Sequence, residues 1–431
     1  MASDDSIPSS IENRMRLLLS RWLPACDFEP LPRFGPGACA ERLSQNRRRQ
    51  LLSRLKDYLS DGNYFRGGMD TSDPLICHQR ARLCAVPKDW NKRRLITVEP
   101  LVSTMLQQMA RSYMIECMRN GPLSKGPWRD FFSYMPSHQR MVALRSSYTR
   151  EYATVDLSDA SDRISYTNVA RVFPTHVLAW LDVSRTPFVE CPCGNIHPLH
   201  IYAGMGNATT FLVETLFFMA LCTAVKQLSG LHGQITVFGD DIIMPSILYE
   251  RQFRGTEYPF FKINSLKSYG LHTSFRESCG IFAYKGIDVT AQKITGAIGA
   301  DAGLVLADLW HRLRASHWLE DQRLAFTVAS DCRVINTPSP TPYSVSEGGL
   351  PYSELPVRLN KAYQRIEYRF PYSRPRYRLL AADKQWMLDS WFIGQAYTTY
   401  RSRKRHGTVT NTCYWAQPLD GSYSDHLWVA P

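Results

Sequence analysis

The chain has 431 residues, of which 44% are hydrophobic and 21% are charged, so a disordered polypeptide is excluded and two or three folded lobes are expected. A formal net charge of +12 favours a polyanionic partner, either nucleic acid or an anionic membrane surface. Eleven cysteines without repeated disulfide spacing indicate reduced thiols, and the polar N-terminus lacks the apolar run of a signal peptide. These features favour a cytoplasmic location.

The N-terminal part predicts helices followed by a pair of strands. Residues 11–60 show helical spacing of apolar side chains, broken by proline and glycine near 30–37. The run Arg47 to Arg49 on the second helical piece is usually a solvated face, with contact to phosphate as the alternative. Residues 82–100 predict a strand, a basic turn and a second strand.

The middle of the chain begins with a short strand and a hairpin. Residues 152–157 predict a strand that ends at Asp156, and Ser158 and Ser161 are predicted helix starts after it. Residues 186–203 predict a hairpin whose tip carries the turn pair Gly-Asn.

A long apolar helix is predicted at 208–228, opened by the glycine-rich loop 204–207. Its most apolar part, 209–225, is shorter than the ~20 residues of a membrane span and contains Glu214. We therefore expect a buried core helix and no membrane, which leaves nucleic acid as the polyanionic partner.

Two further antiparallel pairs are predicted downstream. Residues 235–245 form a predicted hairpin with Gly239 and Asp240 at its tip, because glycine as the first turn residue suits a tight primed turn. Residues 275–295 predict a second pair, and from about 300 the pattern becomes helical and then rich in Pro, Tyr and Arg. This order predicts an α+β centre with additions before and after it.

The chemistry-bearing residues are acids at the ends of strands. Asp156 ends one strand, and Asp240 and Asp241 lie together in a hairpin turn, where adjacent like charges are unfavourable unless a cation neutralises them. Mg²⁺ prefers a few carboxylates with water and phosphate oxygens, and two such ions support phosphoryl transfer. The nearby basic residues that can neutralise a triphosphate are Lys88, Lys92, Arg93 and Arg94.

Other polar clusters have simpler explanations. Asp159 is explained as a helix cap. Cys279 is more readily a packed thiol than a nucleophile. The segment 191–200 contains four candidate zinc ligands, but its CxC pair is not a usual zinc knuckle, and alternate side chains of a hairpin face opposite ways. The four ligands are Cys191, Cys193, His197 and His200.

Several motifs occur together in a specific order. GDD alone is a weak match, but joined to the other blocks it resembles the RNA-directed RNA polymerases of small positive-strand RNA bacteriophages, the levivirus replicase catalytic subunits. The blocks cover roughly residues 80–295 and are VPKDWNKRRLITVEP, VDLSDASDRIS, GMGNATTF, VFGDDIIMP and FRESCG followed by YKGIDVT.

The resemblance implies a right-handed polymerase fold with fingers, palm and thumb, the palm being an antiparallel sheet backed by helices. It implies an N-terminal region and fingers at 1–150, a palm at 151–300 with the hairpin 186–203 as an insertion, and a thumb and C-terminal region at 301–431.

The resemblance also assigns roles to site residues. Two Mg²⁺ ions, with Mn²⁺ as the alternative, would be bound by Asp156 and Asp240, with Asp241 as a lesser contributor. Arg94 and Lys88 would lie over the incoming triphosphate. Lys267 would protonate the leaving pyrophosphate, or simply contact phosphate.

The ribose is expected to be sensed by the 204–207 loop, through Gly206 and Asn207, with Asp162 as a partner. The alternatives are that Asp162 caps its helix or pairs with Arg163, and that Asn207 only shapes the turn. The sequence departs from the family pattern at Phe238, where tyrosine is commoner, and at Gly204, where a serine is usual.

The segment 363–377 alternates arginines with aromatic residues, a composition that suits single-stranded RNA. A surface loop packed by its own aromatics explains the same residues. The candidate RNA-binding residues are Arg365, Arg369, Arg374 and Arg376.

The leading interpretation is an RNA-directed RNA polymerase that replicates a viral RNA genome from ribonucleoside triphosphates in the cytoplasm of a bacterial host. The alternatives are a polymerase related to reverse transcriptases and a non-catalytic RNA-binding protein with a relic palm. Glycine before the Asp pair disfavours the former, and the intact acids disfavour the latter. Relatives imply host translation elongation factors and a ribosomal protein as candidate partners, beside RNA template and product.

Overall fold

The computed structural model describes residues 6–31, 38–42, 80–87, 93–125, 131–256 and 258–291, and four helical residues at 313, 320, 323 and 324. It also describes the backbone of 357–360, 365–375 and 409–416. The chain divides into two compact units, one formed by Met1–Val289 and Gln385–Thr399, the other by Thr290–Lys384 and Tyr400–Pro431.

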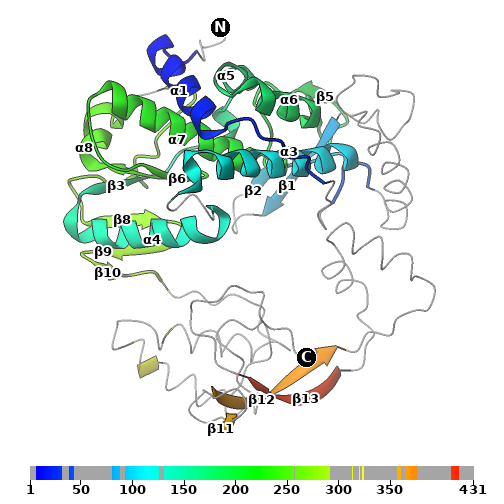
Figure 1. The fold of residues 1–431 in the computed structure, drawn as a ribbon, viewed down its shortest axis with the longest axis vertical. Coiled ribbons are helices and arrows are strands. Elements are labelled where there is room, and N and C mark those ends of the chain that lie inside the picture. The colour runs from blue at the N-terminus through cyan, green and yellow to red at the C-terminus, as the bar shows by residue number, and fades with distance from the viewer. Residues whose placement is uncertain are drawn as a thin grey trace. The chain divides into compact units, whose positions relative to one another are not determined.

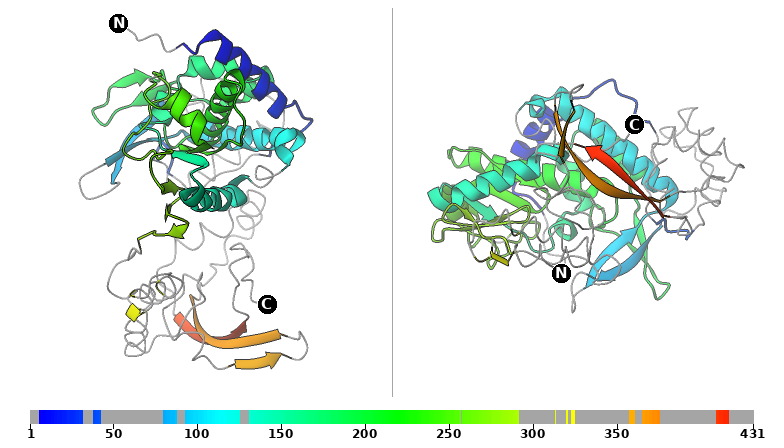
Figure 2. Two further views of the ribbon diagram at one scale, coloured as in Figure 1. Left: turned by 90° about the vertical axis from the view of Figure 1, so that its left-hand side faces the viewer. Right: turned by 90° about the horizontal axis from the view of Figure 1, so that it is seen from below.

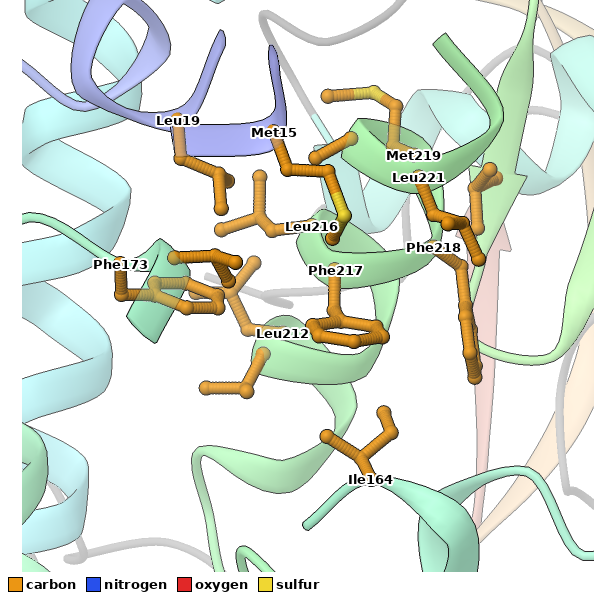
Figure 3. Close-up of a cluster of buried hydrophobic side chains, with 14 of the residues drawn as sticks. Met15, Leu19, Ile164, Phe173, Leu212, Leu216, Phe217, Phe218, Met219 and Leu221 are labelled. Carbon is orange, nitrogen blue, oxygen red and sulfur yellow. The ribbon is translucent and has the colours of Figure 1, made fainter. Parts of the chain in front are cut away.

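The core of the first unit is built around α7 (Thr210–Leu228), shown in Figure 1. This helix is apolar on all sides, so it is stable only when other elements surround it. α1 (Ser9–Trp22) packs against it, and Figure 3 shows Met15 and Leu19 of α1 beside Leu216 and neighbouring side chains of α7. By length and composition α7 could cross a membrane, but 72% of its most apolar window is buried inside the protein. The predicted core helix is therefore present.

The central sheet has three antiparallel strands in the order β3-β7-β6. They are β3 (Tyr152–Val155), β7 (Asp241–Pro245) and β6 (Thr236–Phe238). Ala153 and Val155 of β3, Val237 of β6, and Ile242, Ile243 and Met244 of β7 are buried, which helps to fix the register of the strands. α4 (Phe131–Thr149) contacts β3 and β6, and α7 contacts β6 (Figure 2).

A second sheet has the order β2-β1-β4-β5. β1 (Arg80–Pro87) and β2 (Arg93–Val98) form the predicted antiparallel pair, and β4 (Phe188–Glu190) and β5 (Ile196–Pro198) form the predicted hairpin. β4 pairs with β1 in parallel, which joins the 186–203 hairpin to the strands before it. That long-range pairing is absent from the sequence prediction.

The remaining elements of the first unit surround these sheets. α3 packs against α6, α5 against α1, and the β8–β9 hairpin against α4. Their bounds are α3 (Leu101–Asn120), a short 3₁₀ helix η2 (Pro122–Ser124), a 3₁₀ turn η4 (Ser161–Arg163), α5 (Tyr166–Val172), α6 (Thr175–Ser184), α8 (Ser246–Leu248), a π-helix η5 (Tyr249–Phe253), β8 (Phe275–Ser278), β9 (Ile281–Tyr284) and β10 (Ile287–Asp288).

The second unit contains an antiparallel sheet in the order β11-β12-β13. The strands are β11 (Val357–Asn360), β12 (Arg365–Pro375) and β13 (Val409–Ala416). Residues 365–375 are thus a strand, and the alternative of a surface loop is wrong for them. The side chains of Arg365, Arg369 and Arg374, and all of Arg376, lie outside the described part.

The structure confirms the α+β class and most predicted elements of the first unit. The β6–β7 hairpin turns at Gly239 and Asp240 as predicted, and α7 begins within two residues of its predicted start. The helix starts expected at Ser158 and Ser161 are wrong, because Ser161 begins only the turn η4, and Ser165 caps α5 by accepting a hydrogen bond from the Asn168 amide at 3.2 Å. The run Arg47 to Arg49 lies outside the described residues.

Candidate active site

Three acidic side chains gather at one end of the central sheet. Asp156 directly follows β3, and Asp241 is the first residue of β7. Val155 pairs with Ile242, so the next register position places Asp156 opposite Asp241. Asp240 is exposed at the adjoining hairpin tip. Because opposed positions of antiparallel strands share a face, the register brings the carboxylates of Asp156 and Asp241 together.

Asp156 is held by the segment 262–269, which runs beside β3 on its outer edge. The side-chain amide of Asn264 donates to Asp156 Oδ2 at 2.9 Å. The backbone N–H of Asp156 donates to Ser268 Oγ at 3.1 Å. Lys267 is exposed and lies in the same segment, between Asn264 and Ser268 in sequence. The segment therefore positions the acid and presents Lys267 within the same short loop.

Asp241 is braced from two other elements. The backbone N–H of Cys279, in the β8–β9 turn, donates to Asp241 Oδ2 at 3.1 Å. The fully buried Gln139 of α4 donates its amide to the Asp241 carbonyl at 3.1 Å and accepts from Ser278 Oγ at 3.0 Å. These contacts span up to 139 residues of sequence, so no local pattern could have predicted them.

The turn between β6 and β7 requires its glycine. Gly239 has a φ of 66°, and the ring of Phe211 occupies the space that a Cβ would need. Its backbone N–H donates to Thr215 Oγ1 at 2.9 Å. The rings of Phe211 and Phe238 meet edge to face, with centroids 4.7 Å apart. Phe238 thus acts through its ring, as expected for a replacement of tyrosine that loses only a hydroxyl.

Two acids at this end of the sheet have raised pKa values. Burial, and then repulsion from Asp240 and Asp156, raise the pKa of Asp241 to about 6, although the Cys279 amide opposes the shift. Burial, and then repulsion from Asp240 and Asp162, raise the pKa of Glu214 to about 8. Glu214 is 8% exposed on α7 and has no hydrogen-bond donor among the described residues. In the sequence, Glu214 is evidence only against a membrane span, and no local signal marks it as a neighbour of the site.

Asp162 lies in the η4 turn near the same acids. Burial, and then the nearby Asp159, raise the pKa of Asp162. Arg163 forms its ion pair with Asp159, at 3.9 Å, rather than with Asp162. Within the described residues the Asp162 carboxylate accepts no hydrogen bond, so it stays available to a ligand. The alternative pairing of Asp162 with Arg163 is therefore not what the structure contains.

The 204–209 loop lies against β2 and begins α7. Asn207 is 6% exposed, and its Oδ1 accepts from the backbone N–H and the hydroxyl of Thr209 at 2.9 and 2.7 Å. Its side-chain N–H₂ group has no partner among the described residues. Gly206 has a φ of 149° and approaches the Thr97 carbonyl so closely that no Cβ fits. A Cβ on Gly204 would collide with the Thr97 side chain, so the close packing of this loop against β2 requires glycine at this position.

Sequence-predicted basic residues are only partly described. Arg93 and Arg94 are exposed at the start of β2, whose other end contacts the 204–209 loop through a hydrogen bond from the Thr97 N–H to Met205 O at 3.1 Å. Lys88 and Lys92 lie outside the described residues. The structure thus places Arg94 on the strand that supports the loop of Asn207.

The acids at the sheet end fit a divalent cation in part. Asp156, Asp240 and Asp241 offer the hard oxygen ligands that Mg²⁺ prefers, and burial together with repulsion from the other two acids raises the pKa of Asp241. In the described part of the chain, no three His, Cys, Asp or Glu side chains converge closely enough to enclose an ion by themselves. The donor set therefore fits a site that water and substrate phosphates complete.

The candidate zinc ligands of the 186–203 hairpin do not converge either. Cys191 to His200 are all described, and no group of three potential ligands forms among them or elsewhere in the described ranges. The Cys279 thiol has a pKa raised to about 12 by burial and then by the Asp241 carboxylate, so it is a protonated, packed thiol. The alternative of a nucleophile at Cys279 has no support.

Comparison with known proteins places this site in a family. Residues 67–318 match the family model "RNA replicase, beta-chain". The RNA-directed RNA polymerase subunit beta of Escherichia virus Qbeta is 32% identical over 225 residues, which cover 51% of this chain and 36% of that protein. The RNA-directed RNA polymerase beta chain of Escherichia phage MS2 is 35% identical over 153 residues, covering 36% of this chain and 28% of its own length.

The matched segment thus spans about a third of the length of these relatives. Among solved structures, the RNA-dependent RNA polymerase of a human picorbirnavirus has a TM-score of 0.40 at 14% identity, over 58% of this chain and 55% of that one. A likeness at that level does not decide the fold. The family match covers more than half of the chain and includes every residue of the acidic sheet end. The chain therefore belongs to the RNA replicase beta-chain family.

Proposed function

We propose that the protein is an RNA-directed RNA polymerase that replicates a viral RNA genome from ribonucleoside triphosphates. The observation that carries this proposal is that Asp156 and Asp241 lie opposite each other across β3 and β7, with Asp240 beside them at the hairpin tip. Asp156 and Asp241 are positioned by contacts from different elements, so their proximity is maintained by the fold. An acid with a raised pKa, such as Asp241, is a feature of catalytic sites.

In the proposed reaction, Asp156 and Asp240 are the main ligands of two Mg²⁺ ions, or of Mn²⁺, and Asp241 contributes less because Cys279 already binds one of its oxygens. Bound there, the ions supply activation of the attacking hydroxyl and stabilisation of the leaving pyrophosphate. Asn264 and Ser268 keep Asp156 in one orientation. Gln139 and Thr215 keep the hairpin tip from moving away from β3.

Two sets of cationic side chains act on the triphosphate. Arg94, together with Arg93, Lys88 and Lys92, is proposed to neutralise the phosphates of the incoming nucleotide. Lys267 is proposed to give its proton to the departing pyrophosphate, with a plain phosphate contact as the alternative. Its support is its position in the segment that holds Asp156.

The ribose is proposed to be read by Asp162 and Asn207. The free carboxylate of Asp162 can accept a hydrogen bond from a 2′-hydroxyl. The side-chain oxygen of Asn207 accepts hydrogen bonds from Thr209 at the start of α7, so only its N–H₂ group is left for the sugar. The structural role of Asn207 and its role in sugar recognition are therefore compatible, because they use different atoms of one amide.

We further propose a fingers, palm and thumb arrangement in which the β3-β7-β6 sheet is the palm. The expected partners are RNA template and product, with host translation elongation factors and a ribosomal protein as candidates. The expected location is the cytoplasm of the bacterial host. The division into fingers at 1–150, palm at 151–300 and thumb at 301–431 remains a prediction.

The proposal is tested by incubating the purified full chain with an RNA template, labelled nucleotides and Mg²⁺. We expect labelled RNA that requires both the template and the cation, and that disappears with EDTA. Deoxyribonucleotides incorporated in preference to ribonucleotides would indicate a reverse-transcriptase-like enzyme. RNA binding without any incorporation, under conditions where EDTA makes no difference, would indicate a relic palm.

A further inference from the structure

The segment that holds Asp156 also lines a cavity. Its volume is about 400 Å³, and it lies between the π-helix η5 and the segment 262–273. This volume is within the range of small-molecule sites in proteins, ~300 to 1,000 Å³. π-Helical turns are rare and occur often at functional sites. Neither the sequence motifs nor the proposed catalytic residues include this cavity, except for Ser268, which lines it and also contacts Asp156.

Two lysine or arginine side chains, one histidine and one acid line the cavity. Arg254, Lys262 and His272 line it, and Glu250 is its one acid among the described lining residues. Glu250 accepts a hydrogen bond from Arg254 at 2.7 Å and another from the Leu271 N–H at 3.1 Å. Burial alone would raise the pKa of Glu250, but these hydrogen bonds lower it overall. Glu250 therefore stays ionised, and its carboxylate already has hydrogen-bond donors. A cationic ligand would have to displace Arg254, whereas an anion would not.

The remaining polar groups can donate to an anion. Thr256 and Ser265 line the cavity, and their hydroxyls have no hydrogen-bond partner among the described residues. Lys262 is exposed, and its ammonium has no carboxylate partner in the same ranges. Its backbone carbonyl accepts from the Ser158 N–H at 2.8 Å, which fixes the residue at the cavity rim. Free hydroxyls and a free ammonium around one space form a set of donors that matches phosphate oxygens.

We propose that this cavity is a second phosphate-binding site, which takes the phosphate group of a ribonucleotide through Lys262, Ser265 and Thr256. The phosphate belongs either to a free nucleotide or to the backbone of an RNA strand. The site is separate from the triphosphate position proposed near Arg94, which is on another sheet. It goes beyond the proposed polymerase activity and does not require it.

The test uses the purified full chain in EDTA, so that metal-dependent binding at the acidic sheet end is absent. Binding of pyrophosphate, ATP, a 5′-phosphorylated RNA hexamer and adenosine is measured by equilibrium dialysis. The variants are Lys262→Ala and Ser265→Ala. The matched control is Arg251→Ala, which removes one exposed cation from η5 itself, at a residue that does not line the cavity. Arg94→Ala identifies any binding at the other proposed triphosphate position.

We expect Lys262→Ala to weaken phosphate binding by about tenfold, the loss typical of one charge-assisted hydrogen bond. Arg251→Ala should change phosphate binding by less than about twofold, since Arg251 is exposed to solvent and does not line the cavity. Hydrogen exchange of the 262–273 segment should slow with ligand in the wild type and not in Lys262→Ala. Binding of pyrophosphate and ATP alone would identify free nucleotide as the source, and binding of the hexamer alone would identify RNA; either supports the site.

Equal affinities of Lys262→Ala and Arg251→Ala for every probe would overturn the proposal. So would adenosine binding as tightly as ATP, or complete loss of binding in Arg94→Ala. Failure of the polymerase proposal would appear separately, as absent nucleotide incorporation by the wild type, because these binding measurements involve no turnover.

Discussion

Glu99 and Glu214 are both buried acids of the first unit, at 4% and 8% exposure, yet their surroundings differ completely. Glu99 accepts hydrogen bonds from Thr97 Oγ1 at 2.7 Å, Gln107 Nε2 at 3.0 Å and Thr186 Oγ1 at 2.6 Å. Glu214 has no donor among the described residues and lies near other acids, which after burial raise its pKa to about 8.

The difference separates a structural acid from the acids of a site. Gln107 also accepts from the Ala208 N–H at 3.3 Å, so the Glu99 network ties β2 and α3 to the loop that begins α7. Charges that are satisfied in this way hold elements together. Charges left without donors destabilise the fold, and a protein retains them where a ligand or cation neutralises them. The predictions below test this contrast.

The largest effect is expected at Asp240. Asp240→Asn keeps the shape of the side chain and removes a charge that the cations need, so nucleotide incorporation should fall by more than about 100-fold, beyond the loss typical of indirect metal partners. The melting temperature should stay the same or rise slightly, because repulsion at the hairpin tip decreases. The matched control is Asp159→Asn, an exposed acid of the block that contains Asp156, which should retain incorporation. Normal incorporation by Asp240→Asn would contradict its assignment.

The pH dependence of stability should reveal the uncompensated acids. The folded-state pKa values of Glu214 and Asp241 are raised, to about 8 and about 6, above ordinary values of 4.5 and 3.8. The folded state therefore binds protons more tightly than the unfolded state. The protonated carboxyl groups of Glu214 and Asp241 therefore contribute stability to the folded state. This contribution is fully present below about pH 4 and is lost as pH rises toward 8, by a few kcal/mol at most.

The check is urea unfolding in EDTA at several pH values. Glu214→Gln should flatten the decline of the free energy of unfolding between about pH 6 and 8. In the wild type, Mg²⁺ should weaken the same decline. A slope that is identical in the wild type and in Glu214→Gln would show that Glu214 is not the titrating group.

The same substitution at the two glutamates should have opposite consequences. Glu99→Gln turns an N–H₂ group toward donors that then lack an acceptor, so the free energy of unfolding should fall by about 2 kcal/mol. Glu214→Gln loses no hydrogen bond and should be neutral or stabilising above pH 7. Urea unfolding at pH 7.5 measures the free energy of unfolding of both variants. Equal destabilisation by the two would contradict the difference between a hydrogen-bonded Glu99 and a Glu214 without donors.

Discrimination between ribose and deoxyribose should depend on the carboxylate of Asp162 and on the side-chain N–H₂ group of Asn207. Asp162→Ala and Asn207→Asp should each reduce the preference for ribonucleotides over deoxyribonucleotides, by ~1 to 3 kcal/mol in the barrier difference. Asn207→Asp keeps the oxygen that accepts from Thr209, so α7 still begins normally. Steady-state incorporation of paired nucleotides gives the ratio, and an unchanged ratio in both variants would mean that the sugar is read elsewhere.

The smallest effect is expected at the arginines of the second unit. Replacing Arg374 and Arg376 by alanine should weaken single-stranded RNA binding equally across sequences, because phosphates carry no sequence information. Two lost contacts should lower the slope of log affinity against log salt by ~1.4. Fluorescence anisotropy at several salt concentrations measures it, and a salt-independent affinity of the wild type would require another role for the basic charge.

Sequence reasoning reached the acids because their signals are local. Apolar residues flank Gly239 and Asp240 on both sides, and the short apolar strand predicted at 152–157 ends at Asp156. It also identified the hairpin that became β4 and β5. Each of these follows from the spacing of neighbours within about ten residues.

Sequence reasoning missed what depends on distant packing. Gln139 and Cys279 meet Asp241 from elements far along the chain. Gln139 has no distinctive local pattern, and the FRESCG block that contains Cys279 does not show that its backbone N–H reaches Asp241. Glu214 sits in an apolar helix, where only the tertiary structure shows which acids lie beside it. The parallel pairing of β4 with β1 is likewise a long-range contact.

The most direct test of the central claim is whether a template dictates what the protein adds. The wild-type chain is given a primed RNA whose next template bases are known, with Mg²⁺ and one labelled ribonucleotide at a time. We predict addition of the complementary nucleotide first, a stop where the next required nucleotide is missing, and no addition by Asp240→Asn. Addition of all four nucleotides regardless of template, or equal addition by Asp240→Asn, would contradict a template-directed polymerase built on these acids.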